Sequence, residues 1–306
     1  MKILVTGGAG FIGSHVCDIL LEQNHQITVV DNLSHGHKNL LNPAVNFIQA
    51  DLLDQSKIED TLHGHDAVIH MASFIEVGES VKKAVEFSEN NIVGTVKLLE
   101  AMRKAAVKKI IFSSSACVYG RPKKLPITEE DILGEQENPY GLTKVSMEQF
   151  CILYNKLYNF DVSILRYFNP YGPNELHTPE THAIPNFIKA VLEKKSIPLY
   201  WKGNQIRDFI YIDDLAFAHT LPLSQSGLHI YNVGTQTGTE VIDVVKKIFE
   251  IVGYEVPIED KGERKGDVPS LVASSEKIKQ QFGWQAKVDL DEGLRKTIEF
   301  FKSLKS

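Results

Sequence analysis

The stretch that decides the fold is Thr6-Gly7-Gly8-Ala9-Gly10-Phe11-Ile12-Gly13. It follows a short β-branched run, Lys2–Thr6, and it precedes apolar residues at helical spacing such as Val16 and Leu20. Glycines in a strand-to-helix turn let the backbone approach a pyrophosphate, which the N-terminus of the helix then faces. The stretch therefore predicts a dinucleotide-binding turn. The alternative is a tight turn that uses glycine only for its backbone freedom.

An acidic residue follows at the spacing that a dinucleotide site needs. Asp31 ends the second apolar run, 18 residues after Gly13. In such sites this acid accepts hydrogen bonds from the ribose hydroxyls of the adenosine. Its charge also repels the 2′-phosphate of NADP, so the sequence favours NAD as the cofactor.

Further β-branched runs alternate with helical patterns along the first half of the chain. They are Ile27–Val30, Asn46–Gln49, Ala67–His70, Lys109–Phe112 and Val162–Leu165. Strands that alternate with helices predict a parallel sheet with helices on both faces. We therefore predict the α/β class, with a Rossmann-type doubly wound parallel sheet and a smaller C-terminal substrate lobe.

The local composition changes after Phe168, where Asn, Pro and Gly are frequent and disfavour regular structure. We expect an NAD-binding domain over residues 1–168, with a returning segment near 205–235. A substrate-binding lobe is expected over residues 169–204 and 236–306.

Composition argues against several classes of function. The 306 residues are 43% apolar and 24% charged, and the formal net charge is −6, which disfavours a nucleic-acid partner. No apolar run approaches the roughly 18 residues that cross a bilayer, and the first residues do not resemble a signal peptide. Cys17, Cys117 and Cys151 lack disulfide or zinc spacing. We expect a cytoplasmic protein without a membrane partner or a metal.

A second group of residues predicts acid–base chemistry. Tyr140 and Lys144 are four residues apart on one helical face, where an ammonium stabilises a phenolate and lowers the tyrosine pKa toward neutrality. Ser115 follows the strand Lys109–Phe112, and ligands in open parallel sheets bind at the carboxyl ends of strands. A solvated surface pair and a turn-forming serine cluster are the alternatives, but position and spacing together favour catalysis.

These motifs resemble the extended short-chain dehydrogenase/reductase family and its NAD-dependent epimerase/dehydratase branch. The GxxGxxG spacing, Asp31-Asn32-Leu33, Ala50-Asp51-Leu52 and the set of Ser115, Tyr140 and Lys144 carry the resemblance. Within that branch the chain is most similar to the 4-epimerases of UDP-glucose and UDP-galactose. Further matches are Val77-Gly78-Glu79-Ser80, Asn90-Asn91 and His229-Ile230-Tyr231-Asn232.

The resemblance implies residue roles at the cofactor. NAD would contact Gly7, Gly10, Phe11, Ile12, Gly13, Asp31, Asn32, Asp51, Leu52, Met71, Ala72, Ser73, Asn91, Ser113, Tyr140, Lys144 and Tyr167. Asp51 and Leu52 would flank the adenine. Ala116 and Cys117 stand where related dehydratases and decarboxylases have acidic side chains, so simple epimerisation is implied.

It also implies a UDP-sugar site, with Ser115 and Tyr140 at the hexose. The nucleotide would be held by Asn169 and Tyr200, by the diphosphate arginines Arg207 and Arg264, and by Asp267 at the ribose, while Leu271 would limit the room for a 2-acetamido group. Two departures stand out. Ile75 replaces a lysine found in many such epimerases, and the charge of Glu76 beside the sugar would disfavour a uronate.

The resemblance therefore predicts NAD-dependent 4-epimerisation of UDP-glucose or UDP-galactose through a transient 4-keto sugar. It implies a homodimer built from helices such as Asn91–Ala105 and Tyr140–Tyr158. A 4-epimerase of UDP-N-acetylglucosamine or UDP-glucuronate stays open as an alternative. So does a non-catalytic nucleotide-binding protein, since fold alone does not determine function.

Overall fold

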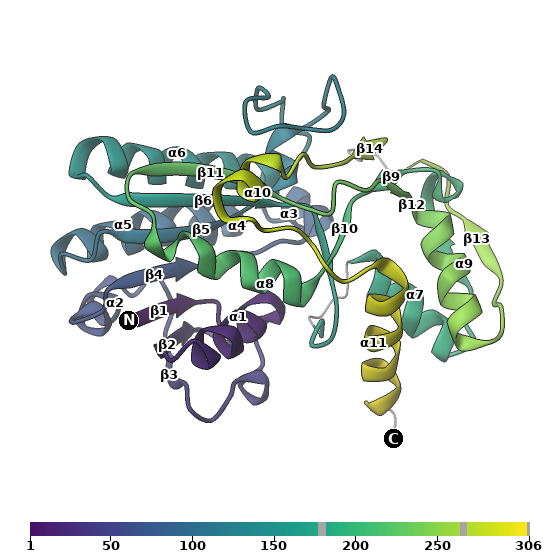
Figure 1. Cartoon of the computed structure of the whole chain (residues 1–306), viewed down its shortest axis with the longest axis horizontal. Helices are drawn as coiled ribbons and strands as arrows, with labels where there is room; N and C mark the ends of the chain where they lie inside the picture. Colours follow the sequence, from purple (N-terminus) through teal and green to yellow (C-terminus); the bar gives the residue numbers. More distant parts are fainter. Residues whose placement is uncertain (177–181, 264–267, 305–306) are drawn as a thin grey trace. The chain divides into compact units, whose positions relative to one another are not determined.

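The computed structural model describes residues 1–176, 182–263 and 268–304, and the chain divides into two compact units (Figure 1). A seven-stranded sheet forms the centre of the first unit. Its strand order is β11-β6-β5-β4-β1-β2-β3. The bounds are β1 Lys2–Thr6, β2 Gln26–Asp31, β3 Asn46–Gln49, β4 Ala67–His70, β5 Lys109–Ser115, β6 Asp161–Tyr167 and β11 Leu228–Val233. Neighbouring strands from β1 to β6 pair in parallel, which confirms the predicted α/β class.

Helices cover both faces of this sheet, with α1 and α8 on one side and α2, α5 and α6 on the other (Figure 1). The helices are α1 Phe11–Glu22, α2 Gln55–Leu62, α3 Val77–Lys82, α4 Ala84–Phe87, η2 Ser88–Val93, α5 Gly94–Lys104, α6 Pro139–Tyr158 and α8 Ile212–Thr220, with short turns η1 Lys38–Leu40, η3 Ala116–Tyr119 and η5 Leu221–Ser224. One apolar core joins alternate strand residues, such as Leu4 and Ile110, to Leu99 of α5 and Met147 of α6. Alternate side chains of a strand point to opposite faces, so one sheet supports two helical layers.

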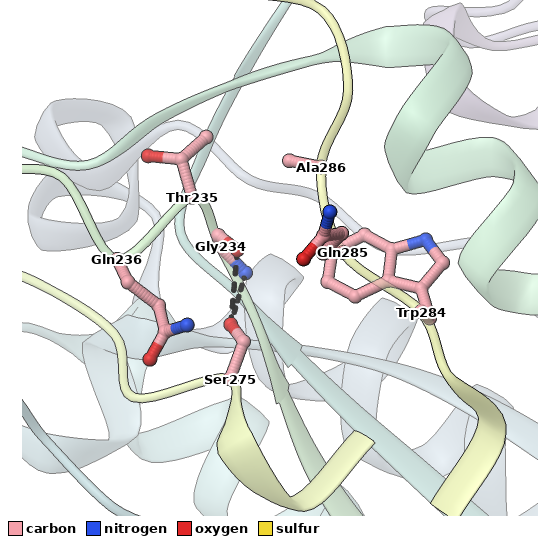
Figure 2. A pocket seen from close by; sticks show the side chains of 7 residues that line it. All are labelled: Gly234, Thr235, Gln236, Ser275, Trp284, Gln285 and Ala286. Carbon is pink, nitrogen blue, oxygen red and sulfur yellow. Dashed lines mark hydrogen bonds between the residues drawn. The ribbon is translucent and has the colours of Figure 1, made fainter. Parts of the chain in front are cut away.

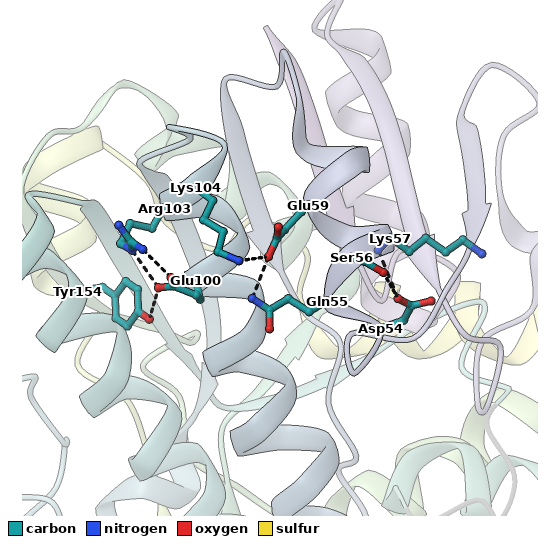
Figure 3. A network of polar contacts seen from close by, with 9 residues as sticks. All are labelled: Asp54, Gln55, Ser56, Lys57, Glu59, Glu100, Arg103, Lys104 and Tyr154. Atoms are coloured by element: carbon teal, nitrogen blue, oxygen red, sulfur yellow. Dashed lines mark hydrogen bonds and ion pairs between the residues drawn. The ribbon is translucent and has the colours of Figure 1, made fainter.

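Polar contacts tie three of these helices together at their outer edges (Figure 3). Lys104 of α5 donates to Glu59 of α2 at 2.7 Å, and the hydroxyl of Tyr154 on α6 donates to Glu100 of α5 at 3.3 Å. Pairs this exposed stabilise a fold only slightly. Their contribution to the free energy of unfolding is therefore small.

Local sequence explains the bounds of α6, the helix that carries Tyr140 and Lys144. The side chain of Asn138 accepts a hydrogen bond from the backbone N–H of Gly141 at 2.9 Å, and Pro139 occupies the first turn. At the other end Asn159 adopts the left-handed conformation, with φ of 54°. The helix thus begins close to the carboxyl edge of the sheet with Tyr140 in its first turn.

The first unit comprises Met1–Gly120, Ile132–Tyr167 and the returning segment Ala216–Tyr231, and the second comprises Arg121–Asp131, Phe168–Leu215 and Asn232–Ser306. Elements of the second unit are β7 Asn169–Tyr171, α7 Ala183–Leu192, β8 Ile197–Leu199, η4 Tyr200–Gly203, β9 Ile206–Arg207, β10 Phe209–Tyr211, β12 Thr239–Glu240, α9 Val241–Val252, β13 Ile258–Asp260, β14 Ser270–Leu271, α10 Glu276–Phe282 and α11 Leu290–Ser303. The roles expected for these units, cofactor binding and substrate binding, stay predictions.

Among the described residues, no helix is long and apolar enough to cross a membrane. In the same residues, His, Cys, Asp and Glu side chains do not gather into a group that could hold a metal ion.

Candidate active site

The turn after β1 is packed so closely that glycine is required. Gly7 has a φ of +72°, and a Cβ added there would lie 2.6 Å from the amide nitrogen of Ala72. A Cβ on Gly13 would lie 2.3 Å from the carbonyl oxygen of Gly7. Both separations are shorter than van der Waals contact, so a side chain at either position would push the loop away from its neighbours.

The start of α1 is open to an anion. Gly10 is its N-cap residue, no side chain among the described residues caps the helix, and its first turn has no acidic residue. The first N–H groups of a helix have no intrahelical acceptor, and the helix dipole places positive charge there. The backbone of Phe11, Ile12 and Gly13 therefore fits a phosphate group of a dinucleotide.

Asp31 lies at the end of β2 beside this turn. Its carboxylate accepts hydrogen bonds from the backbone N–H of Ala9 at 3.1 Å and of Leu33 at 2.8 Å. Burial raises the pKa of Asp31, and these two hydrogen bonds oppose that shift. Nearby, the side chain of Asn32 donates to Asp51 at 2.9 Å, which brings two more of the predicted cofactor residues together.

The segment after β4 is joined to α6 by Asn91. The side chain of Asn91 accepts from the N–H of Phe74 at 2.8 Å and donates to Thr143 at 2.9 Å. It is fully buried, and it also donates to the carbonyl oxygen of Phe74 at 3.0 Å, so it holds the backbone of Phe74 from both sides. A direct contact of Asn91 with NAD stays a prediction.

Ser115, Tyr140 and Lys144 come together at the carboxyl end of β5. The side chain of Ser115 interacts with the Tyr140 phenol and acts to lower its pKa, and the Nζ of Lys144 donates to the carbonyl oxygen of Ser113 at 2.9 Å. Tyr140 is 8% and Lys144 is 4% exposed. Within the first unit, the partly buried Ser115 thus lies beside the buried Tyr140 and Lys144.

The expected fall in the tyrosine pKa is not found. Burial raises the pKa of Tyr140 well above 10, with smaller contributions in the same direction from Cys117, Tyr167 and Glu76, while the bond from Ser115 opposes it. The physical reason is that a phenolate loses its hydration in this site, and the ammonium of Lys144 is bonded to a backbone carbonyl. Forming the phenolate therefore requires further positive charge at the site.

Ser113 of β5 and Tyr167 of β6 both contact His219 of α8. The hydroxyl of Ser113 is hydrogen-bonded to the Nε2 of His219 at 3.1 Å, and the ring of Tyr167 lies 5.5 Å from that imidazole. His219 is fully buried. Ser113 therefore accepts from Lys144 through its carbonyl oxygen, while its side chain is bonded to His219 of α8.

Burial lowers the pKa of Lys144 from 10.5 to about 8. The folded chain then binds fewer protons than the unfolded chain between these two pH values, so unfolding becomes more costly as pH rises through them. We expect the free energy of unfolding of the wild type to rise by about 3 kcal/mol relative to that of Lys144→Met between pH 8 and pH 10.5.

Urea unfolding of the two proteins from pH 7 to 10.5 would measure that difference. Lys156→Met, on the exposed side of the same helix, controls for the loss of a lysine. A constant gap across this range would contradict the prediction.

The second unit holds the predicted nucleotide residues that the structure describes. Arg207 and Leu271 are paired across β9 and β14, while Asn169 lies in β7 and Tyr200 is partly exposed in η4. The guanidinium of Arg207 donates to the carbonyl oxygen of Val268 at 2.8 Å, so it supports the strand that carries Leu271. Arg264 and Asp267 lie outside the described residues. The nucleotide roles of this group stay predictions.

The first unit has the features that a dinucleotide requires: an uncapped helix start, a glycine turn and an acidic residue beside it. A model of the NAD dependent epimerase/dehydratase family matches residues 3–234. The chain belongs to this family.

Similar proteins from other organisms agree with that membership. UDP-glucose 4-epimerase of Bacillus subtilis is 40% identical, over 95% of this chain and 94% of its own. The crystal structure of UDP-glucose 4-epimerase from Thermotoga maritima with UDP-glucose has a TM-score of 0.96 at 36% identity and covers 100% of both chains. The NAD complex of UDP-glucose 4-epimerase from Thermus thermophilus has a TM-score of 0.93 at 33% identity and covers 99% of both.

This epimerase/dehydratase family member also contains a buried ion pair that sequence reasoning missed. Arg166 donates to both oxygens of Glu148, at 2.9 and 2.7 Å, and to the hydroxyl of Tyr119 at 3.0 Å. Ser114 donates to the same carboxylate. Glu148 is one helical turn after Lys144, so the pair ties the catalytic part of α6 to β5 and β6. A charged residue four positions after Lys144 was the available signal.

Asp208 has a comparable structural role in the second unit of this family member. Its carboxylate accepts from Thr235 at 2.7 Å and from the N–H groups of Gln236 and Ala273 at 3.1 Å each. Burial raises its pKa, against these hydrogen bonds. An acid inside an apolar run, directly after Arg207, was the sequence signal for such a centre.

A polar pocket lies next to the loop that Asp208 holds (Figure 2). Its lining is Gly234, Thr235, Gln236, Ser275, Trp284, Gln285 and Ala286. The hydroxyl of Ser275 bonds to both the N–H and the carbonyl oxygen of Gly234, at 3.0 and 2.9 Å. The predicted site residues are not part of this lining, and its two loops are already bonded to each other.

Proposed function

We propose that this chain is an NAD-dependent 4-epimerase that interconverts UDP-glucose and UDP-galactose. The observation that carries the proposal is the grouping of partly buried Ser115 with buried Tyr140 and Lys144 in the same unit as the glycine turn. The family membership and the relatives named above support it, and the cofactor is NAD.

Tyr140 would take the proton of the sugar 4-hydroxyl, with Ser115 as its hydrogen-bond partner. Lys144 would supply positive charge near the phenol as that proton leaves. When bound, NAD supplies the hydride acceptor and donor for carbon 4, and its cationic ring favours the phenolate. Tyr140 would then return the proton after the keto sugar has presented its opposite face.

Epimerisation is favoured over dehydration by the residues next to Ser115. Ala116 has no ionisable group, and burial raises the pKa of the Cys117 thiol to about 11, so this thiol is neutral at pH 7. Elimination of water from a ketone needs an additional acid and base. Oxidation followed by reduction at the same carbon needs only the Tyr140 couple.

The nucleotide would be held more firmly than the sugar, because the ketone must turn before it is reduced. Asn169, Tyr200 and Arg207 are proposed to bind the uridine diphosphate, together with Arg264 and Asp267. Binding energy from the nucleotide, which does not react, would keep the mobile ketone from escaping.

The direct test uses the purified protein with UDP-galactose and no added NAD. Because the cofactor is oxidised again in each turnover, we expect UDP-glucose to form without any stoichiometric oxidant or reductant. Product chromatography would follow the approach to equilibrium from either sugar. A strict requirement for added reductant would contradict the proposal.

Substrate range is expected to depend on Leu271, which is partly buried in β14. A tyrosine at this position is larger, so Leu271→Tyr should lower kcat/KM for UDP-N-acetylglucosamine by about 10- to 100-fold more than for UDP-glucose. Steady-state kinetics on both substrates would measure the ratio. An equal loss on both would show that this side chain does not line the sugar pocket.

We also infer a homodimer and a cytoplasmic location. Leu142, Leu153 and Leu157 are exposed along α6, which supports an association through that helix. The three cysteines are free thiols, which is usual in reducing compartments.

A further inference from the structure

Two loops flank the glycine turn, one on each side of β1. The backbone N–H of His37, in the loop after β2, donates to the carbonyl oxygen of Ala9 at 2.8 Å. On the other side, the loop after β4 contacts the turn so closely that a Cβ on Gly7 would meet Ala72. Since β1 lies between β2 and β4, these loops border the start of α1 from opposite sides.

The same two loops also contact each other. The Nδ1 of His35 lies 3.6 Å from the Oε1 of Glu76, and the rings of His35 and Phe74 meet edge to face at 5.2 Å. Phe74 packs in turn on the buried ring of Phe87. The glycine turn and the two loops therefore form a closed ring of contacts.

The carboxylate of Glu76 is unusual because it is buried with one oxygen unsatisfied. The residue is 3% exposed, and its Oε2 accepts from the N–H of Ile75 at 3.1 Å. Its Oε1 is buried and has no hydrogen-bond partner among the described residues. The 3.6 Å to His35 is longer than a hydrogen bond. A buried carboxylate oxygen in this state is costly, and a small approach of the two loops would satisfy it.

We propose that His35 and Glu76 form a clasp that retains NAD in its site. The inference rests on the proposed NAD-dependent function, and it assigns to Glu76 a role beyond the exclusion of acidic sugars. A dinucleotide held at the N-terminus of α1 would lie next to the glycine turn and would be enclosed by these contacts. Its release would require the two loops to separate, so the clasp acts on the dissociation rate. An enzyme that regenerates its cofactor in every turnover loses nothing when that rate is low.

The test measures release of NAD from the purified holo-protein. Bound NAD is exchanged against excess isotopically labelled NAD and followed by mass spectrometry, for the wild type, His35→Ala, Glu76→Gln and the double variant. We expect each single variant to release NAD about tenfold faster. We expect the double variant to be no faster than the faster single one, since both changes remove one contact.

Glu79→Gln serves as a matched control, because Glu79 pairs with Lys82 and Lys83 at the surface of the adjoining helix α3. An unchanged release rate in both single variants would overturn the proposal. So would an effect of Glu79→Gln equal to that of Glu76→Gln, or single effects that multiply in the double variant. If Glu76→Gln does not fold, His35→Ala removes the same contact and leaves the buried carboxylate in place.

Epimerase assays on the same samples separate this inference from the proposed function. Clasp-dependent retention of NAD without conversion of UDP-galactose would contradict the function alone. If the protein converts UDP-galactose but His35→Ala and Glu76→Gln release NAD at the wild-type rate, the clasp alone is contradicted. A wild-type protein that binds no NAD would overturn both.

Discussion

Tyr140→Phe is expected to lower the kcat for conversion of UDP-galactose by roughly 10³-fold or more, while the protein keeps its NAD. A positioned acid–base group typically contributes about 10² to 10⁴ in rate, and Tyr140 is the group proposed to move the proton in both half-reactions. Phenylalanine has nearly the same shape, so the buried site loses the hydroxyl and its interaction with Ser115 but little packing. Initial rates with a parallel measurement of bound NAD would test this.

Tyr154→Phe is the matched control for that substitution. Tyr154 lies on the same helix, is as buried as Tyr140, and its hydroxyl donates to Glu100 instead of facing the catalytic cluster. Its loss should leave kcat within about twofold, because the hydrogen-bond partner of its hydroxyl is Glu100 of α5 and not a catalytic residue. Activity of Tyr140→Phe within tenfold of the wild type would remove Tyr140 from the role of base.

Glu148→Leu is expected to destabilise the chain by about 3–5 kcal/mol, because it leaves the guanidinium of Arg166 buried without its counter-charge. The change also removes the acceptor of Ser114, which precedes catalytic Ser115. Denaturant unfolding of the two proteins would measure the loss. We expect a similar fall in the denaturant midpoint by circular dichroism and by tryptophan fluorescence.

The double variant Glu148→Leu with Arg166→Met distinguishes charge from packing. Buried ion pairs can often be replaced by apolar residues of similar volume, so the second change should recover most of the lost stability. Glu292→Gln, which removes an exposed partner of Lys296 on α11, should cost less than about 1 kcal/mol. A double variant as unstable as Glu148→Leu would show that the pair stabilises the fold through its side-chain packing and not through its charges.

Much of the first unit could be predicted from local patterns. Each of the strands β1 to β6 appears as a predicted run, and the glycine turn follows Thr6 as expected. Strand β11 pairs beside β6 although about 60 residues separate them in the chain, and neither run specifies that partner. Periodicity reports which residues are buried, but it does not report which distant strand they meet.

By itself, the sequence determined the Rossmann-type sheet, the acid at the end of β2 and the approach of Ser115 to the helix that carries Tyr140 and Lys144. These depend on spacing within single strands, turns and helices, where chain geometry leaves few choices. Tertiary structure alone decided the direction of the Tyr140 pKa, the pairing of Glu148 with Arg166 and the contact of His35 with Glu76. Each of these depends on desolvation or on a partner from another element, and both arise only when the elements pack together.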